Sequence, residues 1–332
     1  MLLSHRRLRL SSPPERTQSI HSGQSHATPQ SDRKALLQKR SVAMTVTTRR
    51  AAAASNRGNG QARAIGNSGA PQQRQAFDWN LCRGFLFDID GTLVNSDPLH
   101  LIAIRDMFER TGLRDVTVDH DFIRENVSGV DNAEIAKKWL PHLLPREEDR
   151  IQWAIDKEAY FRQVAEERID EVAVDGLREL IAWIQQENER GGGAAVESKD
   201  KTFFCAAVTN APRENAEMVL NGLGIADNFD IVVIGPECDR AKPHPEPYLK
   251  AMEALGLKPE ECVCIEDSVP GVTAGVAANL YTVGCLTSQT DAALRKVGAS
   301  QTIHDYHELL SEIKRARNGS RTRVLQSQKS LR

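Results

Sequence analysis

The chain has 332 residues, of which 43 are basic, 45 are acidic and 40% are hydrophobic. This length allows one large domain or two modest ones with a sizeable core. No apolar run is long enough to span a bilayer, so we expect no membrane association. The six cysteines fit neither the spacing of a zinc site nor a secreted disulfide framework, so we expect them to be reduced and structural.

The near-neutral balance averages three regions of different charge. Residues 1–75 hold thirteen Lys and Arg and two acids, whereas residues 314–332 hold seven basic residues and no acid. Residues 76–313 hold 23 basic and 43 acidic residues, a net charge of −20. The negative charge of residues 76–313 repels anionic substrates and nucleic acids. The basic tails lack interleaved aromatic residues, so we expect no nucleic-acid binding. An enzyme of this charge that acts on phosphates needs a local cation or a basic pocket.

The first 76 residues are rich in Arg, Ser, Ala, Gln and Gly and nearly lack acids and aromatics. We expect a disordered basic extension. Its composition is typical of a transit peptide for a chloroplast or mitochondrion, and it lacks the hydrophobic segment of a secretory signal. A plain disordered tail on a cytoplasmic protein is the alternative, and Met44 offers an internal start. We expect residues 317–332 to form a second disordered basic tail.

From Phe77 onward the pattern predicts regular elements. A short apolar run at 83–88 predicts a buried strand. Asp97 and Pro98 then supply the start of a helix that ends near Gly112, and the chain stays helical to about residue 170. Further helices and strands alternate after residue 175. The helices are expected near 177–190, 216–223, 245–255 and 271–278, and the strands at 203–208, 231–234, 262–265 and 280–285.

Strands separated by helices are typical of an α/β protein with a doubly wound parallel sheet. The predicted core is formed by residues 77–97 and 172–316, and residues 98–171 form a helical cap inserted after the first strand. The polar, glycine-rich segment at 189–200 is expected to be a surface insertion.

Chemically active side chains follow four of the predicted strands at their carboxyl ends, where ligands bind in such sheets. Any one of them alone would be unremarkable, because lone acids usually cap helices and lone lysines usually face solvent. Their convergence on one rim predicts an active site. These side chains are Asp88 and Asp90 after the first strand, Thr209 and Asn210 after the second, Lys242 after the third, and Glu266 and Asp267 after the fourth.

The residue types fit phosphate transfer. Carboxylates such as Asp88, Asp267 and Glu266, with Asp90 close by, form the hard-oxygen set that Mg²⁺ prefers. Asp88 is the expected nucleophile, which forms an aspartyl-phosphate. Asp90 is expected to protonate the leaving group and then to deprotonate water.

Two further side chains are expected to hold the phosphate. Thr209 and Lys242 can bind phosphate oxygens, Lys242 as a compact point charge. Asn210 lies beside Thr209 and is expected to contribute to substrate binding.

Four segments together resemble the motifs of the haloacid dehalogenase superfamily, in the same order. They are Phe87–Leu93, Val208–Asn210, Lys242–Pro243 and Ile265–Ser268. The resemblance covers roughly residues 80–316, and it implies a Rossmann-like core, Mg²⁺ and an aspartyl-phosphate intermediate.

The position of the cap resembles the branch that contains β-phosphoglucomutase and small sugar-phosphate phosphatases. Residues 95–103 and 206–212 are most similar to a plant broad-range sugar phosphatase. This similarity implies a magnesium-dependent phosphatase that hydrolyses small sugar phosphates, and we expect it to be a monomer.

Three other functions are considered. Dehalogenases of the superfamily do not need the second acid, so Asp90 favours phosphate chemistry. A phosphosugar mutase resembles this chain in the core and in its histidine at position 100, but here residues 127–132 have no Lys or Arg to bind a second phosphate. A non-catalytic binding protein on this fold would be expected to have lost Asp88 or Asp90. In the cap, His100 and Asn132 are the predicted substrate contacts, and Ser128 is a weaker candidate.

Overall fold

The computed structural model describes residues 77–127, 130–191 and 202–330. The N-terminal extension, Ser128 and most of the predicted surface insertion lie outside the described residues, and so the predictions for them stay predictions.

The core is a six-stranded parallel sheet with the strand order β3-β2-β1-β4-β5-β6. The order reverses next to β1, which lies between β2 and β4 and pairs with both. Ligands bind at such a reversal, beyond the carboxyl ends of the strands. The strands are β1 Gly84–Phe87, β2 Phe204–Thr209, β3 Ile231–Ile234, β4 Cys262–Glu266, β5 Tyr281–Cys285 and β6 Gln301–Ile303.

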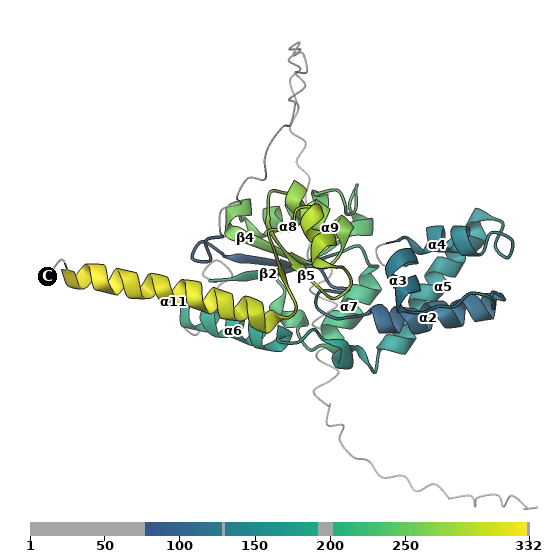
Figure 1. Ribbon diagram of the computed structural model, residues 1–332, viewed down its shortest axis with the longest axis horizontal. Coiled ribbons are helices and arrows are strands. Elements are labelled where there is room, and N and C mark those ends of the chain that lie inside the picture. The colour runs from purple at the N-terminus through teal and green to yellow at the C-terminus, as the bar shows by residue number, and fades with distance from the viewer. Residues whose placement is uncertain (1–76, 128–129, 192–201, 331–332) are drawn as a thin grey trace, which may run out of the picture. The chain divides into compact units, whose positions relative to one another are not determined.

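Helices cover both faces of the sheet, which is why the central strands are apolar throughout rather than alternating. Phe85 and Phe87 of β1 point to one face and pack with residues of α6, α7 and α11. Leu86, between them in sequence, packs on the other face with residues of α8 and α9. Figure 1 shows α6 beside α11, and α8 beside α9. These helices are α6 Leu177–Gly191, α7 Arg213–Gly222, α8 Glu246–Leu255, α9 Val269–Ala277 and α11 Tyr306–Ser330.

Four helices follow β1 and form a cap with its own apolar core, which includes Phe108, Phe122 and Trp153. The chain enters and leaves this cap through two paired segments. The Asn95 backbone N–H donates to the Val172 carbonyl at 2.7 Å, and the Val174 N–H donates to the Leu93 carbonyl at 3.0 Å. The cap helices are α2 Asp97–Thr111, α3 His120–Asn126, α4 Asn132–Trp139 and α5 Glu147–Ala165.

The remaining elements are short. The helix α10 covers Asp291–Lys296 and precedes β6. Short 3₁₀ turns occupy Ile169–Val172, Ala226–Asn228, Gly235–Glu237 and Pro259–Glu261. Within the described residues, no helix combines the length and the apolar character needed to cross a membrane.

The predicted doubly wound parallel sheet is confirmed, with two differences. The sequence pattern did not predict α10 or the strand β6, because β6 has three residues and only Ile303 is fully buried. The helix α11 continues to Ser330, beyond residue 317, where the predicted basic tail begins. Its first turns are anchored by the buried side chains of Leu309 and Ile313, and extending an established helix is far easier than starting one.

Candidate active site

The turn after β1 carries the two acids predicted to do the chemistry. The Asp88 N–H still pairs with the Ile265 carbonyl of β4 at 3.0 Å, whereas Asp90 lies beyond the ladder. Gly91 has a φ of +76°, and a Cβ atom at this position would clash with the Asp267 carboxylate. Glycine is therefore required at position 91, both by the backbone conformation and by the close approach of Asp267.

Lys242 is buried at the centre of the site. Its ammonium donates three hydrogen bonds of 2.6 Å, to Asp88 Oδ1, to Glu266 Oε1 and to the Val208 carbonyl. Asn210 holds the backbone of Lys242 from both sides, because its Nδ2 donates to the Lys242 carbonyl at 3.0 Å and its Oδ1 accepts from the Lys242 N–H at 3.1 Å. The peptide bond between Lys242 and Pro243 is cis.

Glu266 is fully buried, and both of its oxygens are occupied. Oε1 accepts from Lys242 and from the Tyr248 hydroxyl at 2.9 Å. Oε2 accepts from the backbone N–H groups of Asp267 at 3.2 Å and Ser268 at 3.3 Å, and from the Ser268 hydroxyl at 3.0 Å. This carboxylate fixes Lys242 and the end of β4.

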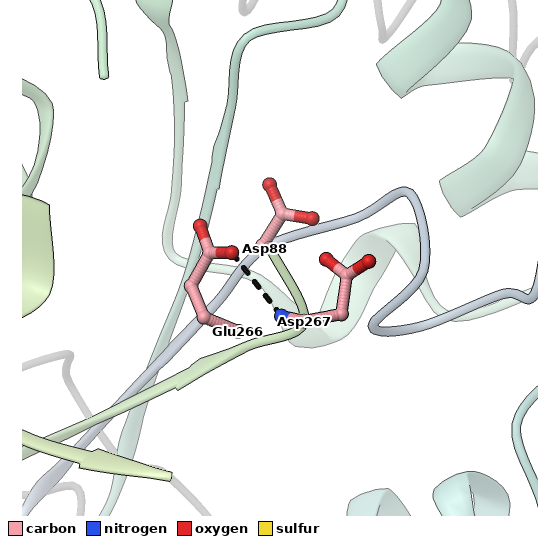
Figure 2. Close-up of side chains that lie close together, drawn as sticks. All are labelled: Asp88, Glu266 and Asp267. Carbon is pink, nitrogen blue, oxygen red and sulfur yellow. Dashed lines mark hydrogen bonds between the residues drawn. The ribbon is translucent and has the colours of Figure 1, made fainter. Parts of the chain in front are cut away.

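Figure 2 shows the carboxyl groups of Asp88, Glu266 and Asp267 gathered at neighbouring strand ends. One oxygen atom from each lies within 4.8 Å of the others. Asp267 also accepts from the Ser288 hydroxyl and from Thr92 Oγ1, whereas no described residue donates to Asp88 Oδ2.

The Lys242 ammonium contacts two carboxylates, and the third carboxylate, that of Asp267, lies close to both, so one positive charge faces three acidic groups. Burial raises the pKa of Asp88 well above its usual range; the Lys242 charge opposes this shift, while Glu266 and Asp267 add to it. Burial and the Glu266 charge likewise raise the pKa of Asp267. Burial alone would lower the pKa of Lys242, but the carboxylates of Asp88 and Glu266 outweigh burial and raise it. Both shifts favour the protonated form, because the single cation does not neutralise the whole group.

This excess of charge and the oxygen-only donors fit a divalent cation such as Mg²⁺. Asp88 and Asp267 are the side chains best placed to bind it, because Glu266 is already occupied by five hydrogen-bond donors. The carboxylate of Asp90 is not in this group, and the metal role predicted for Asp90 stays a prediction.

Asp90 instead faces the cap. Its Oδ1 accepts from the Ser96 hydroxyl at 2.8 Å and lies 3.7 Å from His100 Nε2. Burial alone would raise the pKa of Asp90, but hydrogen bonding and charge from His100, the Ser96 hydroxyl and the charge of Lys157 together lower it. His100 stacks on Phe161 with a ring separation of 4.0 Å, which fixes the plane of the imidazole.

A buried polar network continues from His100 through the cap to the core. Lys157 Nζ lies 3.1 Å from His100 Nδ1 and donates to Glu158 Oε1 at 2.9 Å. Glu158 also accepts from the Nδ2 atoms of Asn132 in α4 and Asn215 in α7. The Glu158 carboxylate thereby joins two cap helices to a helix of the core.

The strand ends and the cap enclose a cavity of about 500 Å³. Its lining includes seven of the residues predicted for catalysis or substrate binding, namely Asp88, Asp90, His100, Asn132, Thr209, Asn210 and Lys242. Thr209 Oγ1 accepts from the Ala211 N–H at 3.0 Å. The side chain of Asn210 bonds the backbone of Lys242 and therefore supports the lysine in this structure.

Sequence reasoning missed three residues of the site. Ser96, Lys157 and Glu158 all line the cavity. Ser96 lies only six residues after Asp90 and could have been found as its neighbour. Lys157 and Glu158 lie among many charged residues of a long helix, and no local pattern distinguishes them from solvent-exposed charges.

The haloacid dehalogenase-like hydrolase family matches residues 82–279, so the chain belongs to this family. Its sheet order, cap position and buried Asp88–Lys242–Asp267 group agree with that membership.

Individual proteins are similar over the same region. The chain is 31% identical over 233 residues to Protein SUPPRESSOR OF QUENCHING 1, chloroplastic, of Arabidopsis thaliana, which is 69% of this chain but only about a fifth (20%) of that protein. It is 29% identical over 231 residues to the phosphorylated carbohydrates phosphatase of Thermotoga maritima, which is 69% of this chain and 97% of that protein. The solved structure of β-phosphoglucomutase from Clostridium difficile has the same fold, with a TM-score of 0.56, 24% identity, and coverage of 73% of this chain and 99% of that one.

Proposed function

We propose that the protein is a magnesium-dependent phosphatase that hydrolyses small sugar phosphates through an aspartyl-phosphate on Asp88. The observation that carries this proposal is the buried contact of Lys242 with both Asp88 and Glu266, directly beside Asp267. It fixes one carboxylate at the floor of the cavity with an oxygen left for attack. The name of the Thermotoga maritima relative, a phosphatase of phosphorylated carbohydrates, supports the substrate class.

In the first half of the reaction, an oxygen of Asp88 attacks the phosphorus atom and the bond to the sugar oxygen breaks. Asp90 gives a proton to the leaving sugar oxygen. Lys242 and Thr209 lie at the cavity wall where they can bind phosphate oxygens. A Mg²⁺ ion at Asp88 and Asp267 would supply the charge neutralisation that lets a carboxylate approach a phosphate dianion.

In the second half, Asp90 takes a proton from water, the water oxygen attacks the phosphorus atom, and the bond to Asp88 breaks. Inorganic phosphate leaves and Asp88 is regenerated. Asp90 has a lowered pKa in the free protein, so it must gain a proton before the first step. The incoming phosphate brings negative charge next to Asp90, which raises its pKa and favours that protonation.

His100 is proposed to orient Asp90 for both steps. Because the Lys157 ammonium carries only donors, His100 Nδ1 accepts from it and the ring proton resides on Nε2, toward Asp90. In this tautomer the imidazole donates to the Asp90 carboxylate.

A phosphosugar mutase is the second candidate, because the core is shared. The cavity argues against it. Among the described lining residues only Lys157 and Lys242 are cationic; Lys242 is assigned to the first phosphate, and Lys157 already contacts Glu158. A bisphosphate intermediate would therefore lack a cation for its second phosphate.

A panel of sugar phosphates assayed for phosphate release, with Mg²⁺ and with EDTA, tests the proposal. We expect release from several sugar phosphates with Mg²⁺ and loss of release with EDTA. Absence of metal-dependent release from every compound would refute the proposal. Faster formation of glucose 6-phosphate than of free phosphate, from β-glucose 1-phosphate with a trace of the 1,6-bisphosphate, would instead support the mutase.

The compartment is a separate proposal. The basic composition of residues 1–76 and the chloroplastic relative support import into an organelle. A fusion of residues 1–76 to a fluorescent protein tests it, and a fusion that stays in the cytoplasm would refute it.

A further inference from the structure

Part of the wall of the cavity is formed by polar side chains from the cap. Asn132, Lys157 and Glu158 come from α4 and α5, and Asn215 from α7 lies beside them. Asn132 and Asn215 both turn their Nδ2 atoms to Glu158. The Oδ1 atom of Asn132 accepts no hydrogen bond from a described residue, so this wall offers an acceptor to a ligand.

The cavity carries a strong negative charge. Six acids and two lysines line it among the described residues. They are Asp88, Asp90, Asp97, Asp131, Glu158, Asp267, Lys157 and Lys242. A divalent cation at Asp88 and Asp267 and the substrate's own phosphate would roughly cancel each other, so the remaining excess of anions faces the rest of the substrate.

Glu158 holds a fixed part of this charge. Its side chain is nine-tenths buried, and its carboxylate accepts from Lys157, Asn132 and Asn215. Burial alone would raise the pKa of Glu158, but the charges of Lys157 and His100 and the hydrogen bonds from Lys157 and Asn215 lower it. The group is therefore ionised at neutral pH. Its contact with Lys157 also keeps that ammonium from pairing with an anion on the substrate.

We infer that Glu158 is a specificity-determining residue that excludes substrates with a second anionic group, so that the leaving group is an uncharged sugar or polyol. This inference rests on the proposed phosphatase function. A carboxylate or second phosphate on the leaving group would meet a carboxylate in a low-dielectric wall with no free cation beside it, whereas hydroxyl groups can donate to its acceptors.

The test compares two substrates that differ at one carbon. Sorbitol 6-phosphate and 6-phosphogluconate have the same six-carbon chain, and C1 is a hydroxymethyl carbon in the first and a carboxylate carbon in the second. We expect kcat/KM for 6-phosphogluconate to be lower by about tenfold or more, since one unfavourable charge contact of this kind is worth about a factor of ten. Equal kcat/KM values for the two compounds in the wild-type protein would overturn the inference without any variant.

The variant E158Q assigns the effect to this side chain. Glutamine keeps the shape of the side chain and removes its charge. We therefore expect the ratio of kcat/KM for sorbitol 6-phosphate to kcat/KM for 6-phosphogluconate to fall at least about threefold, the low end of the effect of one charge contact. The matched control is E187Q, which removes a similarly buried glutamate on α6 that does not line the cavity and should leave the ratio unchanged. An unchanged ratio in E158Q, or an equal narrowing in E187Q, would overturn the role of Glu158. Absence of phosphate release from either compound and from the wider sugar-phosphate panel would instead count against the phosphatase function itself.

Discussion

Two walls of the same cavity are built in different ways. At the strand ends, the reactive side chains are held by neighbouring backbone: Lys242 donates to the Val208 carbonyl, and Glu266 accepts from the next two N–H groups. On the cap side, Lys157 and Glu158 are held by side chains from other helices. Backbone support fixes the reacting atoms rigidly, whereas side-chain support can be changed by single substitutions. We therefore expect chemistry to depend on the first wall and substrate choice on the second.

The largest expected effect is at the nucleophile. Asp88→Asn should lower phosphate release at least about a thousandfold, as removal of a covalent nucleophile does. The protein should stay folded, and its melting temperature in EDTA should equal or exceed that of the wild type, because one of the carboxylates that share Lys242 becomes neutral. Phosphate assays and thermal unfolding measure the two effects. Near-normal turnover would show that Asp88 is not the nucleophile.

Asp90 should come next. Asp90→Asn removes the proposed acid–base group, and we expect kcat to fall by roughly 10²–10⁴ with little change in melting temperature. The exposed surface acid Asp239, changed to Asn, serves as the control and should leave kcat unchanged. If Asp90→Asn changed kcat no more than the Asp239 control does, Asp90 would not be the acid–base group.

A substitution at Gly91 tests how closely the residues at the strand ends are packed. Gly91→Ala combines an unfavourable positive φ with a clash against Asp267, so the Mg²⁺ concentration for half-maximal activity should rise about tenfold or more. Gly224→Ala is the matched control, because Gly224 has a φ of +68° and a Cβ atom added there would meet no atom within 4 Å. Both variants should lose about 1 kcal/mol of stability from the backbone strain. An equal effect of the two variants on the Mg²⁺ requirement would show that the contact with Asp267 is unimportant.

The smallest effect concerns the cap wall. The pKa of Glu158 is lowered in the folded protein, so the native state binds fewer protons there than the unfolded chain. The resulting stability is present above the ordinary glutamate pKa of about 4.3 and is lost as pH falls through the folded value. The wild type should therefore melt roughly 2–4 °C above E158Q at pH 7, and the gap should close below about pH 4. Thermal unfolding between pH 7 and 3.5 measures it, and a gap that is constant with pH would contradict the assignment.

Much of the first wall could be read from the sequence. Asp88, Asp90, Lys242 and Asp267 each follow an apolar run, and parallel strands bring their carboxyl ends to one edge of a sheet. The helices that follow the first strand could also be predicted. The strand β6 and the full extent of α11 could not be predicted. A three-residue strand and a polar basic helix depend on what they pack against rather than on their own sequence pattern.

The sequence by itself determined the fold class, the rim of reactive groups and the type of chemistry, because these follow from local strand patterns and the topology of a parallel sheet. Only the tertiary structure decided which carboxylates are free. It showed that Glu266 is occupied by Lys242 and backbone N–H groups, and that Asp90 faces His100 rather than the group of Asp88, Glu266 and Asp267. It also brought Glu158 of the cap to Asn215 of the core, 57 positions along the chain. Contacts of that kind depend on how the helices pack, and no spacing in the sequence records them.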